Sequence, residues 1–258
     1  MTVVAVVDIS SSHIEVGFAG HSRSVAKIQR DIEWLDDDML TYKTCRTWFH
    51  DVLLCDSKDA KVVISEPLWL SMKRKLRISK VLFNRLRVNS ITFLPNCLGV
   101  FIGAGIKNGL YIEVDAQHTE LMPVFEGRLL DLFSQSSKVG YDDMSSLQKD
   151  LSNVTLEDTD ELSLPMLVST LRKKLPIDLR NAVLKQLVVV SRNNVVLSYL
   201  KEQNKDTSVV ESLGSWIGTS IYTWCNLMKG LPDDLEVKRI YFEQHGKIPD
   251  WSLHKFEM

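Results

Sequence analysis

The N-terminal segment carries two successive apolar patterns, and it constrains the fold more than any other part of the chain. Residues 3–9 are apolar apart from Asp8, and residues 14–18 alternate between apolar and other side chains. An unbroken apolar run fits a strand covered on both faces, and alternation fits a strand covered on one face. The serines Ser10–Ser12 between the two runs are typical of a tight turn. We therefore expect a β-hairpin whose first strand is buried.

Strands and helices are expected to alternate along the rest of the chain. Short apolar runs predict strands, and apolar residues at helical spacing predict amphipathic helices. This alternation places the chain in the α/β class. The polar segment 127–162 is expected to be a loop, and Trp34 and Trp48 are expected to anchor the weakly patterned segment 21–60. The expected strands cover residues 61–65, 90–94, 110–114, 119–125 and 187–190, and the expected helices cover residues 70–87, 98–105, 164–175, 179–186 and 209–231.

Composition and cysteine usage exclude several classes of protein. The net charge of −2 over 258 residues offers no basic footprint for a nucleic acid. No apolar run approaches the roughly 18 residues of a membrane span, so no membrane partner is expected. None of the four cysteines lies in a CxxC pair or at zinc-finger spacing, so no metal site is predicted. We expect reduced thiols, as in a cytoplasmic protein, and the N-terminus lacks the positive charge of a signal peptide.

Two clusters of charged residues each allow a structural and a functional interpretation. The acidic segment Asp36–Asp38 could bind a cation, but a solvated loop is the favoured interpretation. The predicted helix 70–87 has one basic face, which we interpret as solvated in preference to a surface that binds a partner. That face carries Lys73, Arg74, Lys75, Arg77 and Lys80.

Histidine and aromatic side chains give weaker indications. His13 and His118 could each act as a general base, but each lies in a predicted hairpin without an evident nucleophile beside it. We interpret both as surface or core histidines. Trp251 and Phe256 near the chain end either pack on their own domain, which we favour, or anchor a partner. No catalytic residue is predicted.

Several segments resemble actin and its relatives, in the same order along the chain. They include VVDISSSHIEVGFAG, VVISEPLW, NGLYIEVDAQHTELMPVFEG, KLPIDLRNAVLKQLVVVS and ESLGSWIGTSI. The resemblance implies the two-lobed, ribonuclease H-like α/β fold of actin. It places the first lobe at residues 1–127 with 212–258, and the second lobe at residues 128–211.

The resemblance also assigns a nucleotide-binding turn. In actin-like ATPases two glycine-rich turns and a lysine hold the phosphates, because glycine lets backbone amides approach the oxygens. The first turn corresponds to Asp8 with Ser10, Ser11 and Ser12, and Glu15 stands at the lysine position. A carboxylate facing a triphosphate is repulsive unless it turns away or binds a cation. The serine hydroxyls could still donate hydrogen bonds to a nucleotide.

The other parts of the implied nucleotide site also depart from the family pattern. In the second turn Glu113 keeps the first acidic position, and Ala116 loses the second. The helix near 97–105 lacks the glutamine that positions the attacking water, and Ser191–Asn194 replaces the glycine pair that binds adenosine. We therefore expect no ATP hydrolysis and no enzyme activity. We expect no cofactor, with a structural ATP or ADP at Asp8 and Ser10–Ser12 as the alternative.

The segments that would form actin's pointed-end subdomains are short in this chain. A reduced second subdomain is expected at about 21–60 and a largely lost fourth subdomain at about 128–163. Within the family, LPIDLR at 175–180 and IPDW at 248–251 resemble the actin-related proteins of the dynactin pointed end. Because filaments grow head to tail, a subunit without a pointed face terminates growth.

The resemblance thus implies a non-catalytic cytoplasmic and cytoskeletal subunit. It would cap the pointed end of dynactin's actin-like filament, recruit other pointed-end subunits and support dynein-driven transport. Its partners would be a filament subunit and the pointed-end subunits. Two alternatives stay open: a nuclear actin-related scaffold of a chromatin-remodelling complex, and a small actin-fold ATPase or phosphotransferase.

Overall fold

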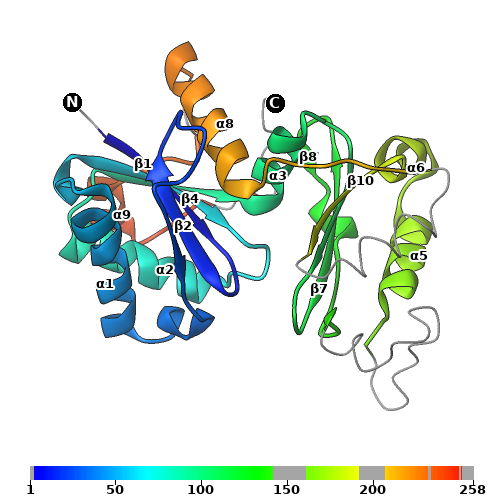
Figure 1. Ribbon diagram of the computed structural model, residues 1–258, viewed down its shortest axis with the longest axis horizontal. Coiled ribbons are helices and arrows are strands. Elements are labelled where there is room, and N and C mark those ends of the chain that lie inside the picture. Colours follow the sequence, from blue (N-terminus) through cyan, green and yellow to red (C-terminus); the bar gives the residue numbers. More distant parts are fainter. Residues whose placement is uncertain (1–2, 142–160, 192–206, 232–233, 250, 252–258) are drawn as a thin grey trace. The chain divides into compact units, whose positions relative to one another are not determined.

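Two compact units make up the chain, each with its own β-sheet and helices (Figure 1). Unit 1 comprises Met1–Gly103 with Leu213–Trp251, and unit 2 comprises Ala104–Ser212 with Ser252–Met258. The expected two-lobed α/β architecture is confirmed. No helix among the residues described is long and apolar enough to cross a membrane. The computed structural model describes residues 3–141, 161–191, 207–231, 234–249 and 251.

The sheet of unit 1 has parallel strands at its centre and antiparallel strands at its edges. Its strands follow the order β12-β5-β4-β1-β2-β3. Strands β5, β4 and β1 run parallel, whereas β2, β3 and β12 each pair antiparallel with a neighbour. The predicted hairpin is confirmed, since Ser10–Ser12 joins β1 to β2. The strands are β1 (Val3–Ile9), β2 (His13–Phe18), β3 (Ala26–Gln29), β4 (Ala60–Glu66), β5 (Ser90–Pro95) and β12 (Val237–Lys238).

Helices pack on both faces of this sheet. Ala5, Val7 and Ile9 of β1 lie in one buried cluster with residues of η1, α1, η2, α2, η4 and α9. Asp8 points to the opposite face, where it contacts α8. Figure 1 shows α8 across the sheet from α1, α2 and α9. The helices are η1 (Ile32–Leu35), α1 (Asp38–Thr47), η2 (Trp48–Leu53), η3 (Ser57–Asp59), α2 (Met72–Lys80), η4 (Val81–Arg85), α3 (Asn96–Ala104), α8 (Ser215–Lys229) and α9 (Arg239–His245).

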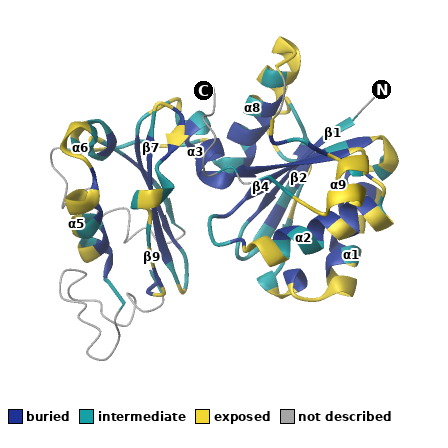
Figure 2. Cartoon of the chain, turned by 180° about the vertical axis from the view of Figure 1, so that it is seen from behind, coloured by how far each residue is buried: buried dark blue, intermediate teal, exposed yellow. Residues whose placement is uncertain are grey.

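Segment 21–60 packs on the core of unit 1. Trp34 and Trp48 are almost fully buried, and their rings meet edge to face with centroids 6.0 Å apart. The two tryptophans therefore anchor this segment, as predicted. A reduced subdomain was expected at about 21–60. In the structure β3 instead extends the sheet by pairing with β2, and α1 and η2 pack in the helical layer that covers it. In Figure 2 the buried sides of α1 and α2 contrast with their exposed outer sides.

The sheet of unit 2 contains the second predicted hairpin, formed by β6 and β7. Its strands follow the order β11-β10-β6-β7-β8, and β9 also pairs with β7. Helices α5 and α6 pack on this sheet through Leu167, Leu171 and Val183, which share a buried cluster with Ile112 and Leu121. The elements are β6 (Gly109–Val114), β7 (Thr119–Phe125), β8 (Arg128–Leu129), η5 (Asp131–Phe133), β9 (Gln135–Ser137), α5 (Leu164–Lys174), α6 (Ile177–Leu184), β10 (Gln186–Ser191) and β11 (Ser208–Val209).

The boundary between the units differs from the one expected at residue 127. Strands β6 and β7 belong to unit 2, because β6 pairs in parallel with β10. The expected loop 127–162 contains β8, η5 and β9 in its described part, and much of the expected subdomain remnant at 128–163 lies outside the described residues. The helix expected from residue 209 begins only at Ser215.

Helices α3 and α8 approach each other closely at two glycines. A Cβ atom added to Gly218 would lie 1.8 Å from the carbonyl oxygen of Gly99, and one added to Gly99 would lie 2.4 Å from that of Ser215. The nearest atoms belong to the backbone, so no flexible side chain can yield. The two helices therefore pack backbone against backbone at these glycines.

Replacing Gly218 by alanine should therefore destabilise the protein. The added methyl group forces α3 and α8 apart, and overpacking of this kind costs about 3 kcal/mol. The free energy of unfolding, measured in urea by tryptophan fluorescence, gives the value. Gly105→Ala is the matched control, because nothing lies within 4 Å of its Cβ position and only its left-handed φ of +68° opposes the change. It should cost about 1 kcal/mol, and equal losses in the two variants would contradict the close approach.

Candidate functional site

The side chains of the predicted nucleotide turn bond mainly to His13. The Ser10 hydroxyl lies 2.7 Å from Nδ1 of His13, donates to the His13 carbonyl oxygen and accepts from its amide. The Ser12 hydroxyl lies 3.3 Å from the same Nδ1 atom. The amide of Ser10 also donates to the His13 carbonyl oxygen, at 2.9 Å. The Ser10 hydroxyl and amide thus already have partners inside the turn, and Ser11 is partly exposed at its tip.

The expectation that His13 has no nucleophile beside it was wrong. The contact with Ser10 and a 3.5 Å distance from Nε2 to Oε1 of Glu15 form a Ser–His–Glu chain. The Ser10 hydroxyl is nevertheless bound to both backbone groups of His13, as in turns that serine closes through the backbone. No periodic pattern signals this contact, because it spans a turn in which residues three apart meet.

Glu15 occupies the position at which the family resemblance places a lysine, and it is bound to a lysine from the next strand. Its carboxylate accepts from Lys27 at 3.0 Å and from Ser24 at 3.1 Å. Glu15 and Lys27 are directly opposed in the pairing of β2 with β3. The hydrogen bond from His13, supported by Lys27 and Ser24, lowers the pKa of Glu15 to about 2 despite its partial burial. The carboxylate is therefore ionised at neutral pH, with Lys27 as its cation.

Asp8 is held by residues outside the turn. It is buried, and the hydroxyl of Ser215 donates to its Oδ1 atom at 2.8 Å. The Ser215 hydroxyl lies 2.6 Å from that of Ser65, so β1, β4 and α8 are joined by one network. Burial raises the pKa of Asp8 above its usual value, although the bonds from Ser65 and Ser215 oppose the rise. Asp8 thus ties the sheet to α8.

The second predicted turn lies between β6 and β7 in unit 2, and its amides are also engaged. The amide of Asp115 donates to the carbonyl oxygen of His118, and that of Ala116 donates to Oδ1 of Asp115. A Cβ atom on Gly140 would lie 2.2 Å from the Ala116 carbonyl oxygen, so the chain at residue 140 lies directly against this turn. His118 is partly buried, and burial lowers its pKa.

A triphosphate needs unpaired amides and cations, and some of these groups are already paired in each turn. The amides of Ser10, Asp115 and Ala116 already have acceptors. Lys27 already binds a carboxylate that carries full negative charge. Of the third predicted element, the adenosine turn Ser191–Asn194, only Ser191 lies within the described residues.

Lys75 was wrongly placed on the exposed basic face. It is buried, and its Nζ atom lies 2.5 Å from Oε1 of Glu66, which is also buried. The ring nitrogen of Trp251 donates to the same oxygen, and the Lys75 ammonium lies 5.7 Å from the Trp251 ring centroid. Trp251 therefore packs on its own unit, as favoured, while Phe256 lies outside the described residues. No helical pattern signals these contacts, because Glu66 lies in β4 and Trp251 far along the sequence.

The acidic segment Asp36–Asp38 is exposed to solvent, as expected, but its side chains also have partners in the protein. Asp36 pairs with Arg74, and Asp38 pairs with Arg77 at 2.6 Å. Asp37 caps α1 by accepting from the amide of Leu40 at 2.7 Å. The acidic segment and the basic helix face, which were interpreted separately, thus neutralise each other in part.

Glu113 and Glu120 are opposed residues of β6 and β7, and both are buried. The hydroxyl of Tyr111 donates to Glu113 at 2.8 Å, whereas Oε2 of Glu120 is buried without a hydrogen-bond partner. Burial, with a smaller contribution from Glu113, raises the pKa of Glu120 to about 8. Glu120 is therefore mostly protonated at neutral pH, which avoids two adjacent buried negative charges.

Unfolding should accordingly depend on pH through Glu120. Its folded pKa of about 8 exceeds the unfolded value of 4.5, so its contribution is complete below pH 4.5 and is lost as the pH rises towards 8. Glu120→Gln should remove this dependence and stabilise the protein by about 1–3 kcal/mol at alkaline pH. Urea unfolding across this range measures the effect, with the exposed Glu126→Gln as control. Parallel pH profiles for wild type and Glu120→Gln would contradict the assignment.

Comparison with known proteins identifies relatives of the chain. The family model described as Actin matches residues 33–162, about half of the chain. The chain is also similar to the actin-like protein ARP10 of Saccharomyces cerevisiae, with 22% identity over 180 residues. The match covers 64% of this chain and 63% of the yeast protein, so the chain spans less than two thirds of that relative's length.

Proposed function

The chain belongs to the actin family, and from this premise we propose that it is a non-catalytic subunit that caps the pointed end of dynactin's actin-like filament. In this role it recruits other pointed-end subunits and supports dynein-driven transport in the cytoplasm and cytoskeleton. Its direct partners are a filament subunit and the pointed-end subunits. The likeness to the actin-like protein ARP10 and the LPIDLR and IPDW motifs support this assignment.

The observation that carries the proposal is the place of segment 21–60. Instead of projecting as a separate subdomain, it packs against the sheet of unit 1 through Trp34, Trp48 and their buried neighbours. An actin-related subunit without a projecting pointed-end subdomain can dock on a filament. It then offers no surface to the next subunit. Filament growth is heterologous and head to tail, so such a subunit terminates it.

We assign the filament-facing surface to the exposed side of α8. Ile221, Trp224 and Met228 follow helical spacing and are 39%, 47% and 70% exposed. An apolar stripe of this kind on one helix is typical of a protein–protein contact. A buried contact with a filament subunit would remove it from water.

Electron microscopy of purified dynactin carrying a labelled copy of this chain tests the position. The label should lie at the pointed end, and a label inside the filament or at its barbed end would refute the proposal. The double variant Ile221→Glu with Met228→Glu should reduce incorporation about tenfold, because charges would be buried at the interface. Leu54→Glu is the control, since Leu54 is 79% exposed on a different helix end, and it should incorporate like the wild type.

Absence of catalysis is the second part of the proposal, and it is tested separately. The paired amides of Ser10, Asp115 and Ala116 and the ionised Glu15 support it. The purified chain should release phosphate from ATP no faster than a buffer blank. Turnover above that level would favour the actin-fold ATPase or phosphotransferase. In a separate experiment, co-purification of the chain with a nuclear remodelling complex would favour the nuclear scaffold.

A further inference from the structure

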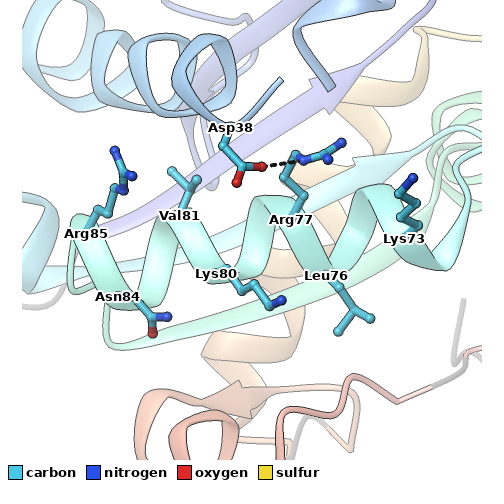
Figure 3. Close-up of a pocket in the computed structure, with 8 residues that line it drawn as sticks. All are labelled: Asp38, Lys73, Leu76, Arg77, Lys80, Val81, Asn84 and Arg85. Atoms are coloured by element: carbon cyan, nitrogen blue, oxygen red, sulfur yellow. Dashed lines mark hydrogen bonds and ion pairs between the residues drawn. The ribbon is translucent and has the colours of Figure 1, made fainter. Parts of the chain in front are cut away.

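A basic groove of about 540 Å³ runs along the outer side of α2 and η4 in unit 1. Figure 3 shows Arg77 and Val81 on the side of the helix near Asp38, whereas Leu76, Lys80 and Asn84 point away from it. The groove has the size of a site for a ligand or a short peptide segment. It is lined by Asp38, Lys73, Leu76, Arg77, Lys80, Val81, Asn84 and Arg85.

The carboxylates at this surface leave part of its positive charge unpaired. Asp38 is bound to Arg77 at 2.6 Å, and Asp36 is bound to Arg74. Lys73 and Lys80 are exposed, and neither forms an ion pair with any residue in the described part of the chain. They lie seven residues apart, so they stand about two helical turns, or roughly 10 Å, apart on one side of the helix.

Apolar surface is interleaved with these cations. Leu76 lies between Lys73 and Lys80 along the groove and is partly exposed. At the far end, the Arg85 guanidinium lies 5.2 Å from the ring centroid of Tyr42 and 3.6 Å from the sulfur atom of Met39. Met39 is 51% exposed. The surface therefore offers both positive charge and apolar contact.

We propose that this groove binds an acidic amphipathic segment of a partner protein. Two carboxylates of the segment pair with Lys73 and Lys80, and an apolar residue between them packs on Leu76. Charge complementarity selects an acidic ligand. The apolar surface at Leu76 and the Asp38 carboxylate favour a peptide, because both would contact a nucleic acid unfavourably. In addition, the chain's net charge of −2 provides no long-range attraction for a polyanion. The proposal needs no filament, so it goes beyond pointed-end capping.

A direct binding experiment uses the full chain and a synthetic fluorescent peptide of about 14 residues, or four helical turns. The peptide carries glutamates and leucines at helical spacing. Fluorescence anisotropy measures its affinity, and hydrogen–deuterium exchange locates it. Saturable binding that protects residues 72–85 and weakens with salt is expected. No binding, or protection elsewhere, would overturn the proposal.

Matched variants separate the groove from general charge. Lys73→Glu with Lys80→Glu should weaken binding about tenfold or more, because two attractive pairs become repulsive. Lys58→Glu with Lys229→Glu changes the net charge equally at exposed lysines elsewhere in unit 1, and it should alter the affinity less than about twofold. Equal losses in the two double variants would show that only net charge matters, and would overturn the proposal.

Altered peptides and competing polyanions test whether the groove recognises both charge and apolar surface. A peptide in which glutamines replace the glutamates, and one in which serines replace the leucines, should each bind at least about tenfold more weakly. Single-stranded RNA and vesicles rich in phosphatidylserine should not displace the acidic peptide at equal charge concentration. Displacement by either, or full affinity of the serine peptide, would mark the groove as a general polyanion surface and refute the assignment. Circular dichroism of each protein variant confirms that it is folded.

Discussion

The packing of α8 on α3 and on the N-terminal sheet is the contact on which unit 1 depends. The helix begins more than a hundred residues after α3, yet Gly99 and Gly218 bring the two backbones together without room for a methyl group. The indole nitrogen of Trp216 then donates to the Val6 carbonyl oxygen at 3.0 Å. A Cβ atom on Gly17 would meet the Trp216 ring at 2.5 Å, so β2 also depends on this approach. The late segment thereby completes a unit that the first residues begin.

The packing of α8 also determines the hydrogen-bond partners of Asp8. Ser215, at the start of α8, binds the carboxylate that the family pattern would place at a nucleotide. Glu15 and Lys27 form a cross-strand pair where the pattern has a single lysine, so the charge change on β2 is compensated on β3. Hydrogen bonds within the protein thus stabilise the turn. A hairpin that is held by its own side chains has less need of phosphate oxygens to keep its shape.

Local sequence patterns predicted the helices and strands better than they predicted which of these elements contact each other. The hairpin at Ser10–Ser12 and the helix over 70–87 follow from residues close in sequence, and both are present. Lys75 shows the limit, because a helical pattern assigns it to a basic face. Its partners are Glu66, nine residues earlier in β4, and Trp251, which is far away in the sequence. The expected boundary at residue 127 came from the family resemblance. In the structure β6 lies in unit 2, where it pairs with β10.

The two proposed contact surfaces lie on opposite faces of the sheet of unit 1. The α2 groove belongs to the layer that packs on Ala5, Val7 and Ile9, and α8 lies across the sheet from that layer (Figure 1). The pairs Asp36–Arg74 and Asp38–Arg77 link the start of α1 and the residues just before it to α2, beside the unpaired lysines. A subunit that occupies a filament end through α8 therefore keeps its groove accessible to a second partner, as a protein that recruits others must.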